Sequence, residues 1–340
     1  MSKRNRLTVY VQMFVCILSV ILTCNNNFAK DFEDTVTKIF KVSQGQLFYL
    51  KADMGSVDIK SWNRDEVKIT VIKKANTFSQ REAEKIYDDL ELRFDQDGRG
   101  VSVLAEYIGP RRWGNRKLSL HFEILVPQKF DLDINTAGGS IAVDDLLGKI
   151  DLNTSGGSIT AGNIEGPLNA KTSGGSIRVT SAKGDADLNT SGGSISVGET
   201  TGSLYAETSG GSINLDGVDG DTRVFTSGGG LHLKNLAGNV LGSTSGGSIY
   251  AELTGRINRD CSLKTSGGGI TIYLPRTIDA DIDAHTSGGR VTTDFPVTVQ
   301  GKLKSNALYG KIKWRSADRA KDLRRQHSHK RMVINFHHPI

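Results

Sequence analysis

The side chains in this sequence that could do chemistry are acidic groups that recur at fixed spacings. In the first set, successive residues lie 18 positions apart. In the second, they occupy alternate positions of one short stretch, and His285 follows that stretch. The first set is Asp133, Asp151, Asn169 and Asp187, and the second is Asp279, Asp281 and Asp283. Stacked carboxylates repel one another, so a cation or a ligand could bind between them. The alternative is a solvated polar surface that keeps the protein soluble, and the sequence leaves both interpretations open.

Motifs for other chemistry are missing from the sequence. The Gly-Gly runs are not followed by Lys-Ser or Lys-Thr, which a phosphate-binding loop requires. No zinc-ligand spacing occurs, and no Ser-His-Asp set can be assembled from motifs. We therefore predict no enzyme activity, no cofactor and no metal site, and we assign the many serines to the corners of a repeat.

That repeat is the element that must position the acidic groups. Variants of the hexapeptide Thr-Ser-Gly-Gly-Ser-Ile occur nine times, at six intervals of 18 residues and then two of 21. The opening threonines are Thr136, Thr154, Thr172, Thr190, Thr208, Thr226, Thr244, Thr265 and Thr286. A short fixed period is typical of a solenoid, whose units bury their apolar side only by stacking on one another.

Apolar residues alternate with polar ones on both sides of the hexapeptide. Counted from its threonine, the apolar positions lie four and two places before it and five and seven places after it. This alternation predicts strands that pair in parallel with their own copies about 4.8 Å away. We predict an all-β fold, a parallel β-solenoid of about 18 residues per coil with two main strands and a shorter third side. The crossover rule favours right-handed winding.

Two rival solenoids do not fit the repeat. A left-handed hexapeptide helix needs an apolar residue at every sixth position, but Glu165, Lys183 and Thr201 occupy the eleventh place after the threonine. A calcium-binding roll needs an aspartate after its glycines, where this chain has serine and isoleucine. The paired glycines are expected to turn a corner with positive φ, and a second glycine column, beginning at Gly148 and Gly166, to turn another.

Residues 1–29 have the pattern of a secretory signal peptide. Three basic residues precede an apolar run over 7–23, and cleavage is expected after Ala29. The alternatives are an uncleaved anchor helix and, from the loose signal that ends at Cys24, a lipid anchor on that cysteine. The one cysteine that would remain, Cys261, is predicted to be a small core residue.

The two ends of the chain supply its formal net charge of +6. Residues 1–29 hold three basic and no acidic side chains, residues 313–340 hold eight and two, and the body between them has a net charge of −3. A nucleic-acid partner needs basic charge gathered on the folded surface, so none is predicted.

Residues 313–340, after the last coil, are expected to be an irregular basic tail. Residues 322–327 can be back-translated into codons that, read one base later, encode Thr-Ser-Gly-Gly-Asn-Ile. The threonine of this hidden hexapeptide falls 36 residues after Thr286, which is two coils of 18. We interpret the tail as the product of a frameshift near codon 313. Actual codons at 313–328 that do not encode the repeat in the shifted frame would refute this interpretation.

Residues 30–130 are predicted to cap the open end of the solenoid, whose strand edges would otherwise be exposed. Strands are expected at 67–72, 101–107 and 118–126. A helix is expected near 79–92, because Ser79 and Glu82 fit a capping box. One helical face there carries Ala83, Ile86, Tyr87 and Leu90. The solenoid itself is expected over 131–312.

The Gly55-Ser56-Val57 motif, the Val126-Pro127 step and the serial Ser-Gly-Gly-Ser-Ile coils resemble the bacterial "putative adhesin" domain family of unknown function. The resemblance covers about residues 40–312 and implies a signal peptide and a strand–helix front end. It implies no activity, because a fold does not fix a function.

These observations together predict an exported protein that is periplasmic, on the outer surface or extracellular. We expect a non-enzymatic, adhesin-like or scaffolding solenoid of the cell envelope that binds a glycan or another envelope or surface protein. A membrane contact is expected only through a lipid anchor at Cys24. The alternatives are a polysaccharide-active enzyme on a β-helix and a sensory module of envelope signalling.

Overall fold

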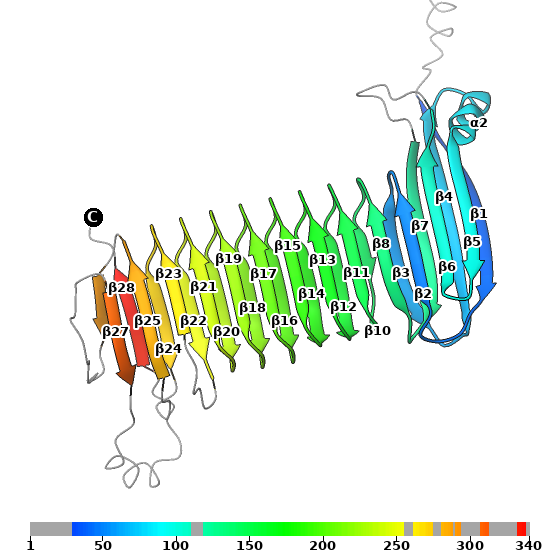
Figure 1. Cartoon of the computed structure of the whole chain (residues 1–340). Helices are drawn as coiled ribbons and strands as arrows, with labels where there is room; N and C mark the ends of the chain where they lie inside the picture. Colours follow the sequence, from blue (N-terminus) through cyan, green and yellow to red (C-terminus); the bar gives the residue numbers. More distant parts are fainter. Residues whose placement is uncertain are drawn as a thin grey trace, which may run out of the picture.

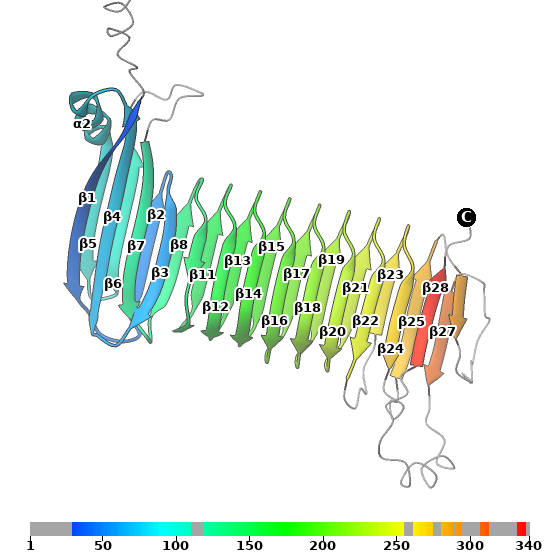
Figure 2. The same cartoon turned by 180° about the vertical axis from the view of Figure 1, so that it is seen from behind.

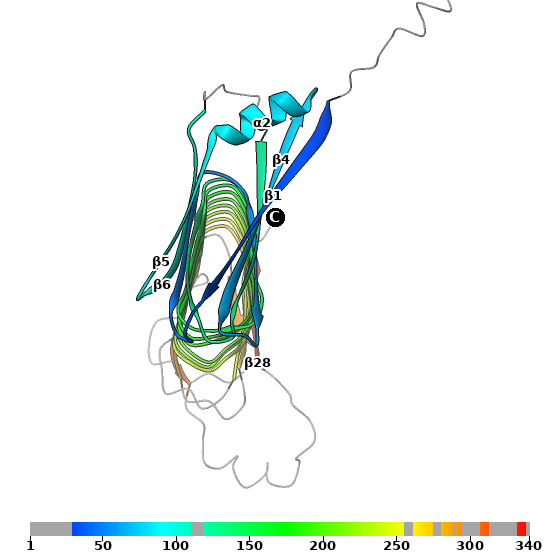
Figure 3. The same cartoon turned by 90° about the vertical axis from the view of Figure 1, so that its right-hand side faces the viewer.

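The computed structural model describes residues 29–109, 118–254, 261–274, 280–287, 290–293, 307–312 and 332–337. Within them, two sheets face each other around one core, and the coils stack into a rod that Figures 1 and 2 show from opposite sides. Seen along the rod, each coil is a flattened loop (Figure 3). The predicted all-β parallel solenoid is confirmed.

The two sheets, called A and B, follow the rod on opposite sides of the core. Sheet A joins, in order, β1 (Lys30–Lys41), β4 (Glu66–Thr77), β7 (Leu118–Pro127), β3 (Ser56–Trp62), β9 (Ile141–Val143), β12 (Ile159–Glu165), β14 (Ile177–Lys183), β16 (Ile195–Thr200), β18 (Ile213–Val218), β20 (Leu231–Leu236), β22 (Ile249–Leu253), β24 (Ile270–Leu274), β28 (Met332–His337) and β26 (Arg290–Thr293), with β10 (Leu146–Leu147) beside β12. Sheet B joins β27 (Ala307–Ile312), β25 (Ala280–Thr286), β23 (Cys261–Thr265), β21 (Val240–Thr244), β19 (Thr222–Thr226), β17 (Leu204–Thr208), β15 (Ala186–Thr190), β13 (Leu168–Thr172), β11 (Ile150–Thr154), β8 (Asp131–Thr136), β2 (Leu47–Ala52), β6 (Gly100–Tyr107) and β5 (Leu90–Asp97).

The apolar columns of the repeat fill the core as predicted. Ile195, for example, lies in register between Ile177 and Ile213 and is 0 % exposed. A further buried column, ten places after the threonine, was not predicted. Its members are Leu146, Ile164, Ala182, Thr200, Val218 and Leu236. Each is the last or next-to-last residue of a strand of sheet A, so the predicted third side of the coil is a continuation of that sheet.

The hexapeptide forms the corner between the sheets through hydrogen bonds that link successive coils. The buried Thr190 Oγ1 donates to the carbonyl of Gly175 in the preceding coil, at 2.7 Å, and accepts from the N–H of Gly193 in its own coil, at 3.3 Å. Ser176 Oγ accepts from the N–H of Ser194 one coil later, at 3.2 Å. The hydroxyl groups of the repeat therefore serve the corner, as predicted.

The paired glycines are needed for space, and the prediction of positive φ is wrong for them. None of them is among the described residues with positive φ. A Cβ on Gly193 would instead lie 2.1 Å from the carbonyl oxygen of Gly175, because successive corners stack backbone on backbone. Positive φ does occur in the second glycine column, at Gly148, Gly166 and Gly184.

The N-terminal part carries the one helix of the described chain, α2 (Gln80–Asp88), at its tip (Figure 1). Ser79 Oγ accepts from the N–H of Glu82 at 3.3 Å, which is the expected cap. The helix ends four residues before the predicted 92. Leu90 and Leu92 belong to β5, where period-two alternation with Phe94 turns them toward the core.

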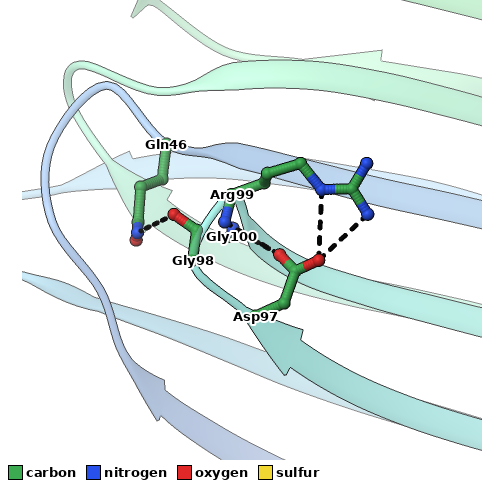
Figure 4. Close-up of polar contacts among 5 residues, drawn as sticks. All are labelled: Gln46, Asp97, Gly98, Arg99 and Gly100. Atoms are coloured by element: carbon green, nitrogen blue, oxygen red, sulfur yellow. Dashed lines mark hydrogen bonds and ion pairs between the residues drawn. The ribbon is translucent and has the colours of Figure 1, made fainter.

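The turn between β5 and β6 is fixed against the first coil (Figure 4). Asp97 accepts from the backbone N–H of Arg99 at 2.8 Å and from its guanidinium at 2.9 Å, and Gln46 Nε2 donates to Gly98 O at 3.1 Å. Gly100 has φ +149°, and a Cβ there would lie 1.9 Å from Leu47 O. The close approach of the Gly100 and Leu47 backbones lies at the start of β6 and β2, which pair in parallel register.

The far end of the rod is closed by antiparallel strands. β27 pairs with β25, and β28 pairs with both β24 and β26. The expectation of an irregular tail is therefore wrong at residues 332–337, because the strand-forming sequence Met-Val-Ile-Asn-Phe-His satisfies an open edge of sheet A. The rest of 313–340 lies outside the described residues, and the frameshift stays a hypothesis.

The described helix is too short and too polar to cross a membrane. The apolar run at 7–23 lies outside the described residues. Export, cleavage and lipidation therefore remain predictions.

Candidate ligand-binding surface

The first predicted acidic set lies on the outer face of sheet B. Asp133, Asp151, Asn169 and Asp187 are directly paired neighbours on β8, β11, β13 and β15. Their flanking residues along each strand are buried, so the four side chains point outward. The repeat thus brings together residues that are far apart in sequence, as predicted.

These carboxylates are satisfied by polar neighbours. The Asp151 carboxylate forms an ion pair with Lys149 Nζ at 3.0 Å and accepts a hydrogen bond from Asn169 Nδ2 at 3.1 Å. The carboxylate raises the pKa of Lys149. Asn169 also separates Asp151 from Asp187, which reduces the repulsion expected of an unbroken acidic stack. Its Oδ1 is buried without a hydrogen-bond partner. Among the described residues, no three His, Cys, Asp or Glu side chains are grouped closely enough to hold a metal ion.

A shallow depression of about 330 Å³ runs along this column. It is lined by Lys149, Asp151, Pro167, Leu168, Asn169, Asp185, Ala186, Asp187, Ser203, Leu204, Tyr205 and Arg223. A second depression of about 230 Å³ adjoins it on the same face, toward the threonine corner. It is lined by Asn153, Lys171, Thr172, Ser173, Asn189, Thr190, Ser191, Glu207 and Ser209. We call the outward side chains of these two depressions the sheet B strip.

Tyr205 is the aromatic member of the sheet B strip. Its ring lies 5.9 Å from that of Phe225 in the next coil. Its hydroxyl donates to Glu207 Oε2, and this bond, with partial burial, raises the pKa of Tyr205 to about 12. The phenol therefore stays a hydrogen-bond donor throughout the neutral range.

Tyr205 makes a testable contribution to the pH dependence of stability. Because the folded state favours the protonated phenol, its stabilising effect is present below the ordinary pKa of 10.0 and lost as pH rises through about 12. Ultraviolet difference titration should show a component at about 12 that is missing in Tyr205→Phe. Glu207→Gln should move that component toward 10.0, and an unmoved component would contradict the assignment.

The second predicted set is not part of this strip. Asp279 lies outside the described residues, and Asp281 and Asp283 lie on β25. Four strand positions, Tyr205, Arg223, Leu241 and Ser262, separate Asp187 from Asp283 along sheet B. The two sets therefore lie on strands that are five positions apart in sheet B.

Cys261 is buried, as predicted from its column. Burial raises the pKa of its thiol to about 12, so the thiolate that would act as nucleophile or metal ligand does not form near neutral pH. This residue packs the core of β23 and has no chemical role in the sheet B strip.

The periodicity of a single column does not indicate several residues of the sheet B strip. Lys149 and Asp185 precede the acidic column by two places, and Lys171 and Glu207 follow it by two. Residues two apart share one face of a strand, so this spacing was the available signal. A separate aromatic stack, also missed, occupies the outer face of sheet A: His232 lies 4.5 Å from Tyr250, whose ring is 5.1 Å from Tyr273.

Solved structures of low sequence identity resemble this chain. A "putative adhesin" from Bacteroides fragilis is 13% identical and aligns over 70% of this chain and 96% of its own, with a TM-score of 0.35. A "putative adhesin" from Parabacteroides merdae is 10% identical over 75% and 94%, with a TM-score of 0.37. A "putative lipid binding protein" from Parabacteroides distasonis is 15% identical over 75% and 95%, with a TM-score of 0.33.

The comparison with curated proteins gives no significant match. A family model described as Toastrack DUF4097 matches residues 50–324, which is most of the chain. The resemblance indicated by the Ser-Gly-Gly-Ser-Ile coils is thereby confirmed, and the chain belongs to the Toastrack DUF4097 family.

Proposed function

We propose that this protein is an exported, non-enzymatic binding protein of the cell envelope, and that its sheet B strip binds a glycan chain. One observation carries the proposal. The strip offers hydroxyl, amide, carboxylate and aromatic groups in two adjoining shallow depressions, repeated at the spacing of the coils, about 4.8 Å.

The composition of the strip supports a ligand rich in hydroxyl groups. Asp187 and Asn189 can accept hydrogen bonds from sugar hydroxyls, and Lys171 can donate them. Tyr205 adds an apolar ring face with a polar hydroxyl at its tip. The ring face can pack on the apolar side of a sugar while the hydroxyl stays on its hydrated side. Both depressions are open, so they support binding along the rod better than the enclosed, water-excluding site that catalysis favours.

The N-terminal sequence supports placement in the envelope. Basic residues followed by the apolar run at 7–23 fit a signal peptide, and Cys24 offers a lipid anchor as the alternative to release.

A glycan array probed with the full chain tests the proposal. Asp187→Ala and Tyr205→Ala should each weaken binding to the best glycan by about 5- to 30-fold, because each removes contacts worth about 1–2 kcal/mol. Asn214→Ala, an exposed change on the outer face of sheet A, is the matched control and should leave affinity unchanged.

Two outcomes would contradict the proposed function. The first is a full chain that binds no glycan, or whose binding is equally weakened by Asn214→Ala. The second is turnover of a polysaccharide that Asp187→Asn abolishes, which would favour the enzyme alternative.

A further inference from the structure

The edge of sheet A at the N-terminal end is a long, open strand. β1 spans 12 residues, Lys30–Lys41, and pairs with β4 on one side only within the described part of the chain. Most of its residues are exposed, and Ile39 is 58 % exposed. Figure 3 views the rod from this end and shows β1 in front of the coils. Two carbonyls of β1 accept side-chain hydrogen bonds, Phe32 O from the Tyr87 hydroxyl at 2.7 Å and Lys41 O from Gln96 Nε2 at 2.6 Å. The rest of the edge has no strand beside it and is a template for pairing with another strand.

The sequence of β1 is complementary to itself in antiparallel orientation. If Val36 is placed opposite Val36 of a second copy, every residue i meets residue 72 − i. The resulting pairs are Asp31 with Lys41, Phe32 with Phe40, Asp34 with Lys38, Thr35 with Thr37, and Glu33 with Ile39. Each acidic residue then meets a lysine or an uncharged residue, and no like charges are opposed.

This register is also consistent with the faces of the strand. Paired residues have the same parity, so both lie on the same face of the joined sheet. Phe32, Val36 and Phe40 lie on the core-facing side of β1, opposite Ala75, Val71 and Val67 of β4, and all three are half-buried. Pairing two copies would place these partly exposed apolar side chains against one another across the new interface.

The charged side chains on either side of Val36 differ in whether they already have a partner within one chain. Lys73 on β4 forms an ion pair with Asp34 and holds the pKa of that carboxyl below its ordinary value, so Asp34 is negative at neutral pH. No ion pair or side-chain hydrogen bond is found in the described residues for Lys38 or Lys41, and both are exposed. A second copy would supply Asp34 and Asp31 as their partners.

We propose that β1 is a homodimerisation edge: two copies join sheet A to sheet A through antiparallel β1 strands, related by a two-fold axis at Val36. The general function of edge charges is to prevent pairing, and randomly placed charges would do so. Here their order around Val36 opposes both Asp31 and Asp34 to lysines in this register, which is the self-complementarity that a two-fold interface requires. The dimer doubles the length of the rod and presents two sheet B strips.

Sedimentation velocity tests the dimer, with the chain mass measured on the same sample. The wild-type chain should sediment as a dimer at micromolar concentration. Lys38→Glu/Lys41→Glu should raise the dissociation constant about tenfold or more, because it opposes like charges in four symmetry-related pairs. Lys51→Glu/Lys60→Glu makes the same charge change at exposed positions on β2 and β3 and should leave the dimer intact.

Mixing complementary variants tests the register. Asp31→Lys/Asp34→Lys should also dissociate alone, and native mass spectrometry of an equimolar mixture with Lys38→Glu/Lys41→Glu should show the mixed dimer. If loss of the Asp34–Lys73 pair unfolds that variant, Asp31→Lys mixed with Lys41→Glu makes the same test at one pair. A wild-type chain that stays monomeric at about 100 µM, a dimer indifferent to these changes, or a mixture without mixed dimer would overturn the proposal.

Discussion

Replacing Ile195 by aspartate is expected to destabilise the solenoid by about 4 kcal/mol or more, because it puts an unpaired charge in a narrow apolar core. Ile195 is fully buried at the start of β16, between Ile177 and Ile213 of the adjacent coils. It belongs to the apolar core cluster that the inward columns of both sheets form. The loss should appear as a lower midpoint of urea unfolding followed by circular dichroism.

The neighbouring residue supplies the control for this substitution. Ser196 points outward from the same strand, beside Arg178 and Asn214 in register. Ser196→Asp adds the same side chain to solvent next to a cation, so its effect should stay within about 0.5 kcal/mol. Equal losses for the two variants, or wild-type unfolding of Ile195→Asp, would refute the inward assignment of the column.

The architecture was predictable from the sequence because the same pattern of apolar and polar residues recurs in every coil of the repeat. Each inward column, such as the one containing Ile177, Ile195 and Ile213, repeats the same alternation in successive coils, so accidental patterns are averaged out. The N-terminal part has no such redundancy. There, apolar residues at 83, 86 and 90 fit a helix, while 90, 92 and 94 equally fit a strand, and only the packing of β5 on the core decides between them.

The candidate site was less predictable because it depends on relations between columns. The outward direction of Asp151 and Asp187 follows from alternation alone. The pairing of Asp151 with Lys149 and Asn169, and the bond from Tyr205 to Glu207, depend on side-chain conformations within one coil or between two adjacent coils. Positional periodicity gives the face on which a residue lies, but it does not give the hydrogen-bond partner that its side chain selects there.

The glycines show a similar limit, in which the position was predicted correctly and the cause was not. A corner requires small residues either for positive φ or for close approach of two backbones, and both requirements select glycine. In the hexapeptide the second cause applies at the second glycine of each pair. This distinction predicts that the two adjacent glycines of one corner differ sharply in their tolerance of a methyl group.

Gly157→Ala is accordingly expected to destabilise the protein by about 3 kcal/mol or more. The added Cβ would lie 2.1 Å from the carbonyl oxygen of Gly139 in the preceding coil. That carbonyl is not free to move, because it accepts the hydrogen bond of the buried Thr154 Oγ1 at 2.7 Å. Relief of the clash would therefore separate the coils or break this bond, and each coil is stabilised mainly by its neighbours.

Gly156→Ala, one residue earlier, is the matched control. Its Cβ would meet the carbonyl oxygen of Gly138 at 3.4 Å, close to an ordinary contact, so a loss below about 1 kcal/mol is expected. Both variants lose the same glycine entropy in the unfolded chain, and the difference between them isolates the contact with the preceding coil. If urea unfolding gave the two variants equal stability, close stacking of the corners could not be what requires the second glycine, and a conformational requirement would have to replace it.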